Sequence, residues 1–325
     1  ALAFISVVLL LHLPNPSSSF CAKFKLIDWW GTFTLVAATI LLLLSLNWGG
    51  SKYGWNNPII IILLCLGGIG YILFAFIEGK IAKDPIAPGR LFKNPKVAAC
   101  FSINFFHGMI MVGLLYFVPL YFQVVKSESA TNSGLELLPY ILGLVVASMS
   151  IGQLVSRTTF FSYGLICIVG SILMGLGAGL ISLFSKDTDK GQVIGYLLIS
   201  GLGVGFITQT TILAGQGIVE HKDVASVTSL LAFFRTIGAV FGVAILGTVF
   251  NNVFNSNLPP EFQGKVSLHD FGTSALDKIP DVIIQTFLLA LNTAIRFLIG
   301  MSALALISSL PIINVKPHRD STKKA

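Results

Sequence analysis

The chain has 325 residues, of which 54% are hydrophobic and only 11% are charged, and its formal net charge is +7. Soluble domains carry about 25% charged residues, so this composition excludes an ordinary soluble protein. The positive charge does not indicate nucleic acid as a partner, because the basic residues are scattered among short loops and do not gather on one face. We therefore expect the lipid bilayer to be a partner.

Eight long apolar segments follow one another along the chain, at residues 29–48, 58–78, 97–122, 135–154, 160–183, 191–218, 224–250 and 294–314. An apolar helix of about 20 residues is long enough to cross the hydrocarbon core of a bilayer. These segments are too long for barrel strands, and only helices or closed barrels satisfy their backbone hydrogen bonds in lipid. The sequence predicts an all-α fold, a polytopic transmembrane helical bundle.

The ends and the longest loop are predicted from the same pattern. Residues 1–13 are apolar and lack an initiator Met, so we interpret them as the end of a truncated ninth span. We expect 251–280 to be an extracytoplasmic loop and 315–325 to be a cytoplasmic tail. The final span is assigned to 281–314, in which 281–293 form either an interfacial helix or the entry to a long, tilted span.

Lysine and arginine predict how the bundle is oriented. Of these 21 residues, thirteen fall in one set of alternate loops, six fall in the opposite set, and Arg235 and Arg296 lie inside apolar segments. Because cytoplasmic loops are enriched in basic residues, we expect the richer set and the C-terminus to be cytoplasmic. A plasma membrane and a vacuolar membrane share this charge bias.

The sequence gives no indication of an enzyme. It contains no HExxH, GxSxG or P-loop motif, its four cysteines show no paired spacing, and its histidines lack the spacing of metal ligands. We therefore expect no catalytic residues, no metal and no cofactor.

Asn104 and His107 lie on one face of segment 97–122, because they are three residues apart. His107 is about ten residues from the expected cytoplasmic end and is therefore near the middle of the membrane. A histidine at this depth is a candidate proton relay. The alternative is a neutral imidazole that is hydrogen-bonded to a neighbouring helix.

A second polar stripe lies in segment 191–218. Gln209 stands among three threonines, and Gln216 follows seven residues later on nearly the same face. This stripe either lines a substrate pathway or supplies hydrogen bonds between helices. Both interpretations remain open at this point.

Arg235 lies about twelve residues into the seventh apolar segment, near the bilayer centre, where a guanidinium has to be hydrated or paired. Glu136 and Glu220 are the partners suggested by residue type. Since a buried charge needs a partner first, a structural or gating ion pair is favoured over contact with substrate. The nearby Gly238 and Gly242 permit close helix packing, or bending.

Five motifs occur in order along most of the chain: Asp28-Trp29-Trp30-Gly31, Pro85-Ile86-Ala87-Pro88 with Leu91-Phe92, Ser133-Gly134 with Leu138-Pro139, residues 152–157, and Asp223-Val224-Ala225-Ser226 with residues 233–238. Their order resembles the C-terminal part of the fungal-type, 14-span drug:proton antiporter family of the major facilitator superfamily. The resemblance implies that residues 29–78 are an extra central helix pair. It also implies that residues 97–250 belong to the C-terminal transporter bundle.

The resemblance assigns roles to the polar residues. Segments 97–122 and 191–218 correspond to cavity-lining helices, which makes Asn104, His107, Gln209 and Gln216 candidates for the substrate and proton pathway. Segment 224–250 corresponds to a rocking helix. A second set, implied to serve gating or structure, consists of Asp28, Arg157, Arg235, Gly238 and Gly242.

The resemblance also implies proton-coupled export of small amphipathic or cationic molecules, as in multidrug or toxin efflux. One alternative is a vacuolar carrier of basic amino acids or siderophores. Another is a membrane sensor, or a truncated pseudo-transporter, that does not transport. Because alternating access needs two halves and the first five spans of the family are absent here, the chain alone is not expected to transport unless the native protein is longer.

Overall fold

The computed structural model describes residues 28–49, 52–80, 88–157, 161–262 and 280–316. Within these ranges, eight helices are long and apolar enough to cross a membrane, which confirms the predicted all-helical class. The long helices are α3 (Trp29–Trp48), α4 (Pro58–Lys80), α6 (Pro95–Val124), α8 (Leu138–Arg157), α9 (Tyr163–Ile181), α10 (Lys190–Ile218), α11 (Val224–Asn257) and α12 (Asp281–Ser309). Residues 1–13, 263–279 and 317–325, for which we predicted a partial span, a loop and a tail, lie outside the described residues.

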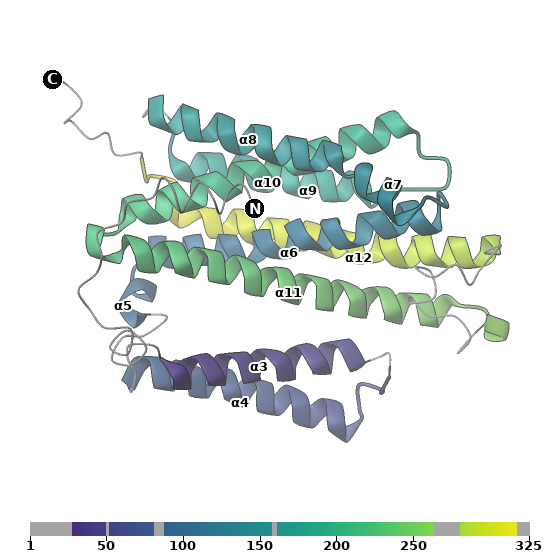
Figure 1. The fold of residues 1–325 in the computed structure, drawn as a ribbon, viewed down its shortest axis with the longest axis horizontal. Coiled ribbons are helices and arrows are strands. Elements are labelled where there is room, and N and C mark those ends of the chain that lie inside the picture. Colours follow the sequence, from purple (N-terminus) through teal and green to yellow (C-terminus); the bar gives the residue numbers. More distant parts are fainter. Residues whose placement is uncertain (1–27, 50–51, 81–87, 158–160, 263–279, 317–325) are drawn as a thin grey trace, which may run out of the picture.

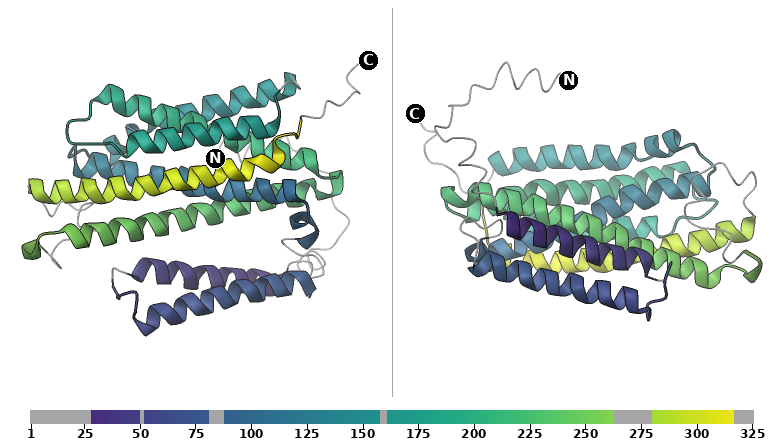
Figure 2. Two further views of the ribbon diagram at one scale, coloured as in Figure 1. Left: turned by 180° about the vertical axis from the view of Figure 1, so that it is seen from behind. Right: turned by 60° about the horizontal axis from the view of Figure 1, so that its bottom comes forward.

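The long helices lie side by side along one axis (Figure 1). Helices α8, α9 and α10 form one side of the bundle, α6 and α12 occupy its middle, and α11 follows. The hairpin formed by α3 and α4 lies outermost, beside α11, and all views show this arrangement (Figure 2). The predicted extra helix pair is thus a separate layer on the flank of the six-helix bundle.

Basic residues gather at one end of the molecule, which we call the basic end. This end holds the start of α6, the start of α11 and the end of α4 (Figure 1). Its described basic residues are Lys80, Arg90, Lys93, Lys96, Lys222 and Lys316.

Helix α6 is the most enclosed of the long helices. Of its most apolar stretch 67% is buried, compared with 11% for the corresponding stretch of α4. It packs against α10, α11 and α12. A helix that is apolar all round belongs inside a bundle or in contact with lipid, and these two helices illustrate the two cases.

Capping side chains set where several helices begin. The Asn94 side chain accepts a hydrogen bond from the backbone N–H of Lys96 at 3.1 Å, at the start of α6. Asp189 caps α10 and forms a reciprocal pair with Gln192. Such caps satisfy backbone N–H groups that a helix start leaves without partners.

One predicted boundary needs correction, and one open alternative is decided. Helix α12 is continuous over Asp281–Ser309, so residues 281–293 are the entry to a long final helix, which was the second of the two alternatives, and not a separate interfacial helix. No glycine or proline interrupts residues 281–299, so nothing breaks the helix there. Helix α11 continues to Asn257, and residues 251–257 are therefore helical and do not belong to a loop.

Glycines bring α6 and α11 into backbone contact. A Cβ atom on Gly108 of α6 would overlap the carbonyl of Arg235 on α11. In the opposite direction, Cβ atoms on Gly238 and Gly242 of α11 would meet the backbones of Phe105 and Met109. Small residues allow this approach in membranes, where van der Waals packing between helices replaces the hydrophobic effect.

An ion pair ties the same two helices together at the basic end. Arg90 of α5 (Gly89–Phe92) donates from Nη2 to Asp223 Oδ1 at 2.6 Å. Asp223 ends the 3-10 helix η1 (His221–Asp223), and its side chain is only 11% exposed, whereas that of Arg90 is 62% exposed. The ion pair therefore joins the segment before α6 to the segment before α11.

Replacing Gly238 by alanine should lower the stability of the protein, because the added methyl group overlaps a backbone carbonyl that cannot move by itself. Overpacking of this kind typically costs about 1–3 kcal/mol. Thermal unfolding of the purified protein in detergent measures the effect. Gly247→Ala is the matched control on the same helix, since a Cβ atom there meets nothing within 4 Å. Equal unfolding temperatures for the two variants would refute the close contact.

A double-mutant cycle tests the Arg90–Asp223 pair. We expect Arg90→Gln and Asp223→Asn to be non-additive, with a coupling energy of up to about 1 kcal/mol that decreases in high salt, because Arg90 is largely in water. The Lys222–Glu220 pair, at 2.7 Å and well exposed on both sides, serves as control and should show no measurable coupling. Additive effects of the two substitutions would mean that the Arg90–Asp223 contact contributes nothing.

Candidate functional site

His107 lies at the contact between α6 and α10, and its side chain is fully buried. Its Nε2 atom is 3.2 Å from the carbonyl oxygen of Val204 and 3.0 Å from Oγ1 of Thr208, both on α10. The Thr208 hydroxyl also donates to the Val204 carbonyl at 2.8 Å. The imidazole thus links the two helices that were predicted to line the central cavity.

The hydrogen bonds of His107 assign its protons. A carbonyl oxygen only accepts, so Nε2 carries the hydrogen that points to Val204, and Nδ1 of the neutral ring is left as an acceptor. Nδ1 is buried, and it has no hydrogen-bond partner within the described part of the chain. A buried acceptor without a partner typically costs about 1–3 kcal/mol. Nδ1 is therefore the atom at which a proton would add.

The other three pathway candidates do not converge on His107. Asn104 is buried and donates to the Cys100 carbonyl of its own helix at 2.9 Å. Gln209 faces α8, where its side chain approaches Gly152. Gln216 donates to Oγ1 of Thr228 on α11 at 3.0 Å.

The partners suggested for Arg235 are wrong. Glu136 pairs with Lys190 at 3.5 Å, and Glu220 pairs with Lys222 at 2.7 Å. Hydrogen bonding to Lys222 also keeps the pKa of Glu220 below its ordinary value. Both glutamates lie near the ends of the bundle, whereas Arg235 lies in the middle of α11. Arg235 forms no ion pair with any of the described residues.

Two further candidates lie at helix ends. Asp28 caps α3, because its Oδ1 atom accepts from the backbone N–H of Gly31 at 2.9 Å. A Cβ atom on Gly31 would overlap the Asp28 carboxylate, which explains the spacing of the Asp-x-x-Gly motif. Arg157 is the last residue of α8, and its side chain lies outside the described residues.

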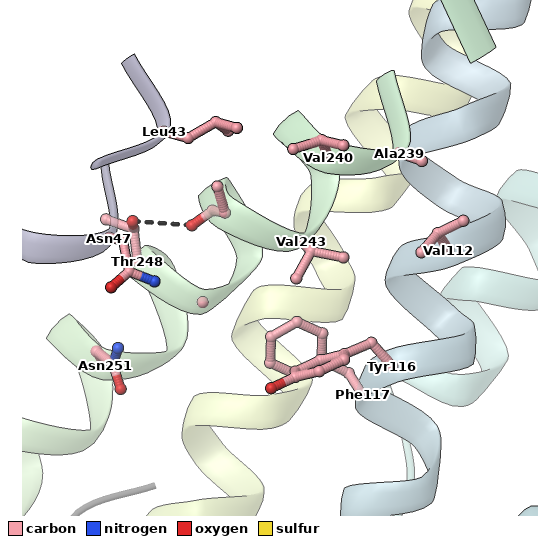
Figure 3. Close-up of a pocket in the computed structure, with 12 residues that line it drawn as sticks. Leu43, Asn47, Val112, Tyr116, Phe117, Ala239, Val240, Val243, Thr248 and Asn251 are labelled. Atoms are coloured by element: carbon pink, nitrogen blue, oxygen red, sulfur yellow. Dashed lines mark hydrogen bonds between the residues drawn. The ribbon is translucent and has the colours of Figure 1, made fainter. Parts of the chain in front are cut away.

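A first cavity, of about 500 Å³, lies between α3, α6 and α11 in the half of the molecule away from the basic end. Figure 3 shows Asn47 and Thr248 on the α3–α11 side and Tyr116 on α6. The Thr248 hydroxyl donates to the Leu46 carbonyl at 2.8 Å and so connects α11 to α3. The lining of this first cavity is partly polar and partly apolar, which suits a small amphipathic molecule.

A second cavity, of about 630 Å³, lies in the half nearer the basic end, between the α3–α4 hairpin and helices α6 and α11. Seven of its fourteen described lining residues are aromatic, and Glu78 is the one formally charged residue among them. The linings of the two cavities contain neighbouring residues of the same helices, Leu42 and Leu43 of α3 and Val240 and Phe241 of α11. They follow the α3–α11 contact in succession, and neither lining includes the four pathway candidates.

Sequence reasoning missed Glu78 and the Arg90–Asp223 pair. Glu78 is an acidic residue at the end of a strongly apolar segment, and this position was the available signal. Arg90 and Asp223 each stand in or beside a recognised motif, but their partnership spans 133 positions and requires the three-dimensional structure. Among the described residues, no group of three or more His, Cys, Asp or Glu side chains could hold a metal ion.

Comparisons with known proteins identify the family to which the chain is similar. The family model of the Major Facilitator Superfamily matches residues 2–243. The aspyridones efflux protein of Neocamarosporium betae is 33% identical over 321 residues, which are 92% of this chain and 57% of that protein. The efflux pump roqT of Penicillium rubens is 33% identical over 333 residues, 97% of this chain and 60% of that protein. The chain thus spans between half and two thirds of the length of these relatives.

A solved structure has a similar fold. It is a bacterial homologue of the human lysosomal transporter Spinster in an inward-facing, occupied conformation, with a TM-score of 0.52 at 13% identity. The similarity covers 86% of this chain and 62% of the other. At this identity the likeness concerns the fold alone. With the family match over most of the chain and fungal efflux pumps among its relatives, this multi-pass membrane protein belongs to the Major Facilitator Superfamily and to its drug-efflux branch.

Proposed function

We propose that the protein to which this chain belongs is a proton-coupled exporter of small amphipathic or cationic molecules. The names of its relatives support efflux. The observation that carries proton coupling is the buried Nδ1 atom of His107, which has no partner among the described residues and sits where α6 meets α10. When a base at a contact between two helices binds a proton, the preferred packing of those helices can change.

Protonation of Nδ1 would place a positive charge in a fully buried site. The Arg235 guanidinium on α11 acts on the same ring electrostatically, so the two positive charges would repel each other. A buried, unpaired charge is costly, and a rearrangement that admits water or a carboxylate relieves that cost. Proton binding would therefore favour a second arrangement of α6 relative to α10 and α11, and substrate would compete for that preference.

The orientation follows from the charge bias. We propose that the basic end faces the cytoplasm, because six described lysines and arginines gather there and cytoplasmic loops are enriched in such residues. The membrane would be the plasma membrane or the vacuolar membrane. In this orientation α11 begins on the cytoplasmic side, and the aromatic cavity lies in the cytoplasmic half.

His107→Gln should abolish the pH dependence of transport, because glutamine keeps hydrogen-bonding groups but does not bind a proton near neutral pH. Dye uptake into inside-out vesicles, in which the cytoplasmic face is outside, provides the readout at a series of imposed pH gradients. We expect at least about a tenfold loss of gradient-driven dye uptake, as for removal of a proton-transferring group, at unchanged protein abundance.

Thr208→Val is the matched control for that experiment. It removes the hydroxyl partner of Nε2 but leaves the imidazole and its Nδ1 atom in place. If the histidine serves only as an interhelical hydrogen bond, the pH profile should keep its shape in both variants. Proton coupling through His107 predicts that only the histidine variant loses the pH dependence.

A further inference from the structure

We propose that the first cavity, here named the α3–α11 cavity, binds a sterol, a flat and uncharged membrane lipid with a single hydroxyl group. The hydroxyl would lie at the end of the cavity that holds Tyr116 and Asn251, and the ring system would lie against α11, towards the middle of the membrane. The inference goes beyond the proposed function, because it assigns a lipid to the contact between the α3–α4 hairpin and the six-helix bundle and requires no transport.

Charge disfavours most other membrane lipids in this cavity. None of its described lining residues is formally charged. A phosphate, carboxylate or ammonium group is costly to take out of water unless a charged partner receives it, and the described lining provides no such partner. We therefore expect the bound lipid to be uncharged.

Polar side chains gather at one end of the α3–α11 cavity. Figure 3 shows Asn251 and Tyr116 at this end and Leu43, Ala239 and Val240 at the other. Within the described part of the chain, neither the Asn251 amide nor the Tyr116 hydroxyl makes a hydrogen bond. An amide and a phenol can both donate and accept hydrogen bonds. Together they suit one hydroxyl group, which also does both.

This polar end lies at the depth of a membrane interface. Tyr116 is about 32 Å along α6 from Pro95 at 1.5 Å per residue, and the hydrocarbon core is about 30 Å thick. Tyrosine is enriched at this depth. By the same measure, Ala239 is only about 23 Å along α11 from Val224, which is within the core. A membrane lipid has the same order, with its polar group at the interface and its apolar part inside.

The walls of the cavity suit a flat, rigid body. Ala239, Ala244 and Gly247 of α11 have small side chains or none and so form a shallow wall, while Val112 and Phe117 line the side formed by α6. A rigid ring system loses less conformational entropy on binding than two flexible acyl chains do. The volume of about 500 Å³ lies within the range of roughly 300–1,000 Å³ that is usual for pockets of single small molecules.

The cavity can be reached from the surrounding lipid. Tyr116 is 50% exposed and Val240 is 37% exposed, although both line the cavity. On the α3 side, Thr248 donates to the Leu46 carbonyl at 2.8 Å and ties α11 to α3. A sterol bound beside this hydrogen bond would fill the contact between the hairpin and α11, and ligand that binds only the folded arrangement stabilises it.

Photo-cross-linking with a diazirine analogue of cholesterol tests the proposal on the purified native protein in phosphatidylcholine nanodiscs. Mass spectrometry of the peptides locates the label. We expect labelled residues among those of α3, α6 and α11 that line the cavity, and we expect excess cholesterol to suppress this label. Cholesterol 3-sulfate has the same rings but a charged head group, and it should not suppress the label, because the lining offers that charge no partner.

A cavity-filling variant separates the cavity from the general lipid surface. Gly247→Leu should reduce the label by at least about tenfold, because the added side chain occupies the space of the rings. A Cβ atom at Gly247 meets nothing within 4 Å, so the substitution does not disturb the helix packing directly. Gly300→Leu on α12 is the matched control, since a Cβ atom there is equally unhindered and Gly300 does not line the cavity. This control should be labelled like the wild type.

A second variant tests the polar end. Asn251→Leu should weaken competition by cholesterol about three- to tenfold, as for the loss of one hydrogen bond. Asn252→Leu makes the same change at the next position of α11, which does not line the cavity, and should have no effect. The two control variants also report whether a loss of label arises from misfolding.

Three results would overturn the proposal. A label that Gly247→Leu leaves unchanged would place the sterol on the outer surface of the helices only. Equal suppression by cholesterol and by its 3-sulfate would refute an uncharged site. Displacement of the sterol by the cation tetraphenylphosphonium, a model substrate, would make the cavity part of the transport pathway. Since labelling needs no gradient, a protein that binds the sterol here but exports nothing would refute the proposed function alone.

Discussion

The backbone contact between α6 and α11 is the constraint on which the rest of the structure depends. Gly108 and Gly238 let each helix approach the carbonyl groups of the other, and this approach holds α6 in the centre of the bundle. With α6 fixed, His107 faces α10 on one side, and the aromatic rings of α6 and α11 face the α3–α4 hairpin on another. The proposed proton site and both cavities are thus arranged around one close helix pair.

Hydropathy predicted the helices well, because a membrane span has to be both long and apolar, and both properties can be read from the sequence. For the final helix, the apolar pattern left two alternatives open for residues 281–293, and only the structure shows that they continue α12 without a break. The candidate site shows the same limit. His107 was singled out by its depth, but its neighbours Val204 and Thr208 follow only from the packing of α10.

Partnerships between distant segments were the least predictable feature. Glu136 and Glu220 matched Arg235 by charge, yet each pairs with a lysine at its own end of the bundle, since exposed charges pair with what is nearest. Arg90 and Asp223 were both visible, but their contact requires α5 and η1 to meet. The sequence also did not predict that Glu78 of the hairpin lines a cavity together with aromatic rings from three other elements.

The central claim is that transport and proton binding are coupled in the native protein. Its most direct test is the pH inside proteoliposomes that contain the purified protein and a pH-sensitive dye, recorded when tetraphenylphosphonium is added outside without any imposed gradient. The account predicts a proton flux opposite to the movement of the cation, present in wild type and absent in His107→Gln. Cation movement that exceeds that of protein-free liposomes, with no change in the internal pH, would contradict it.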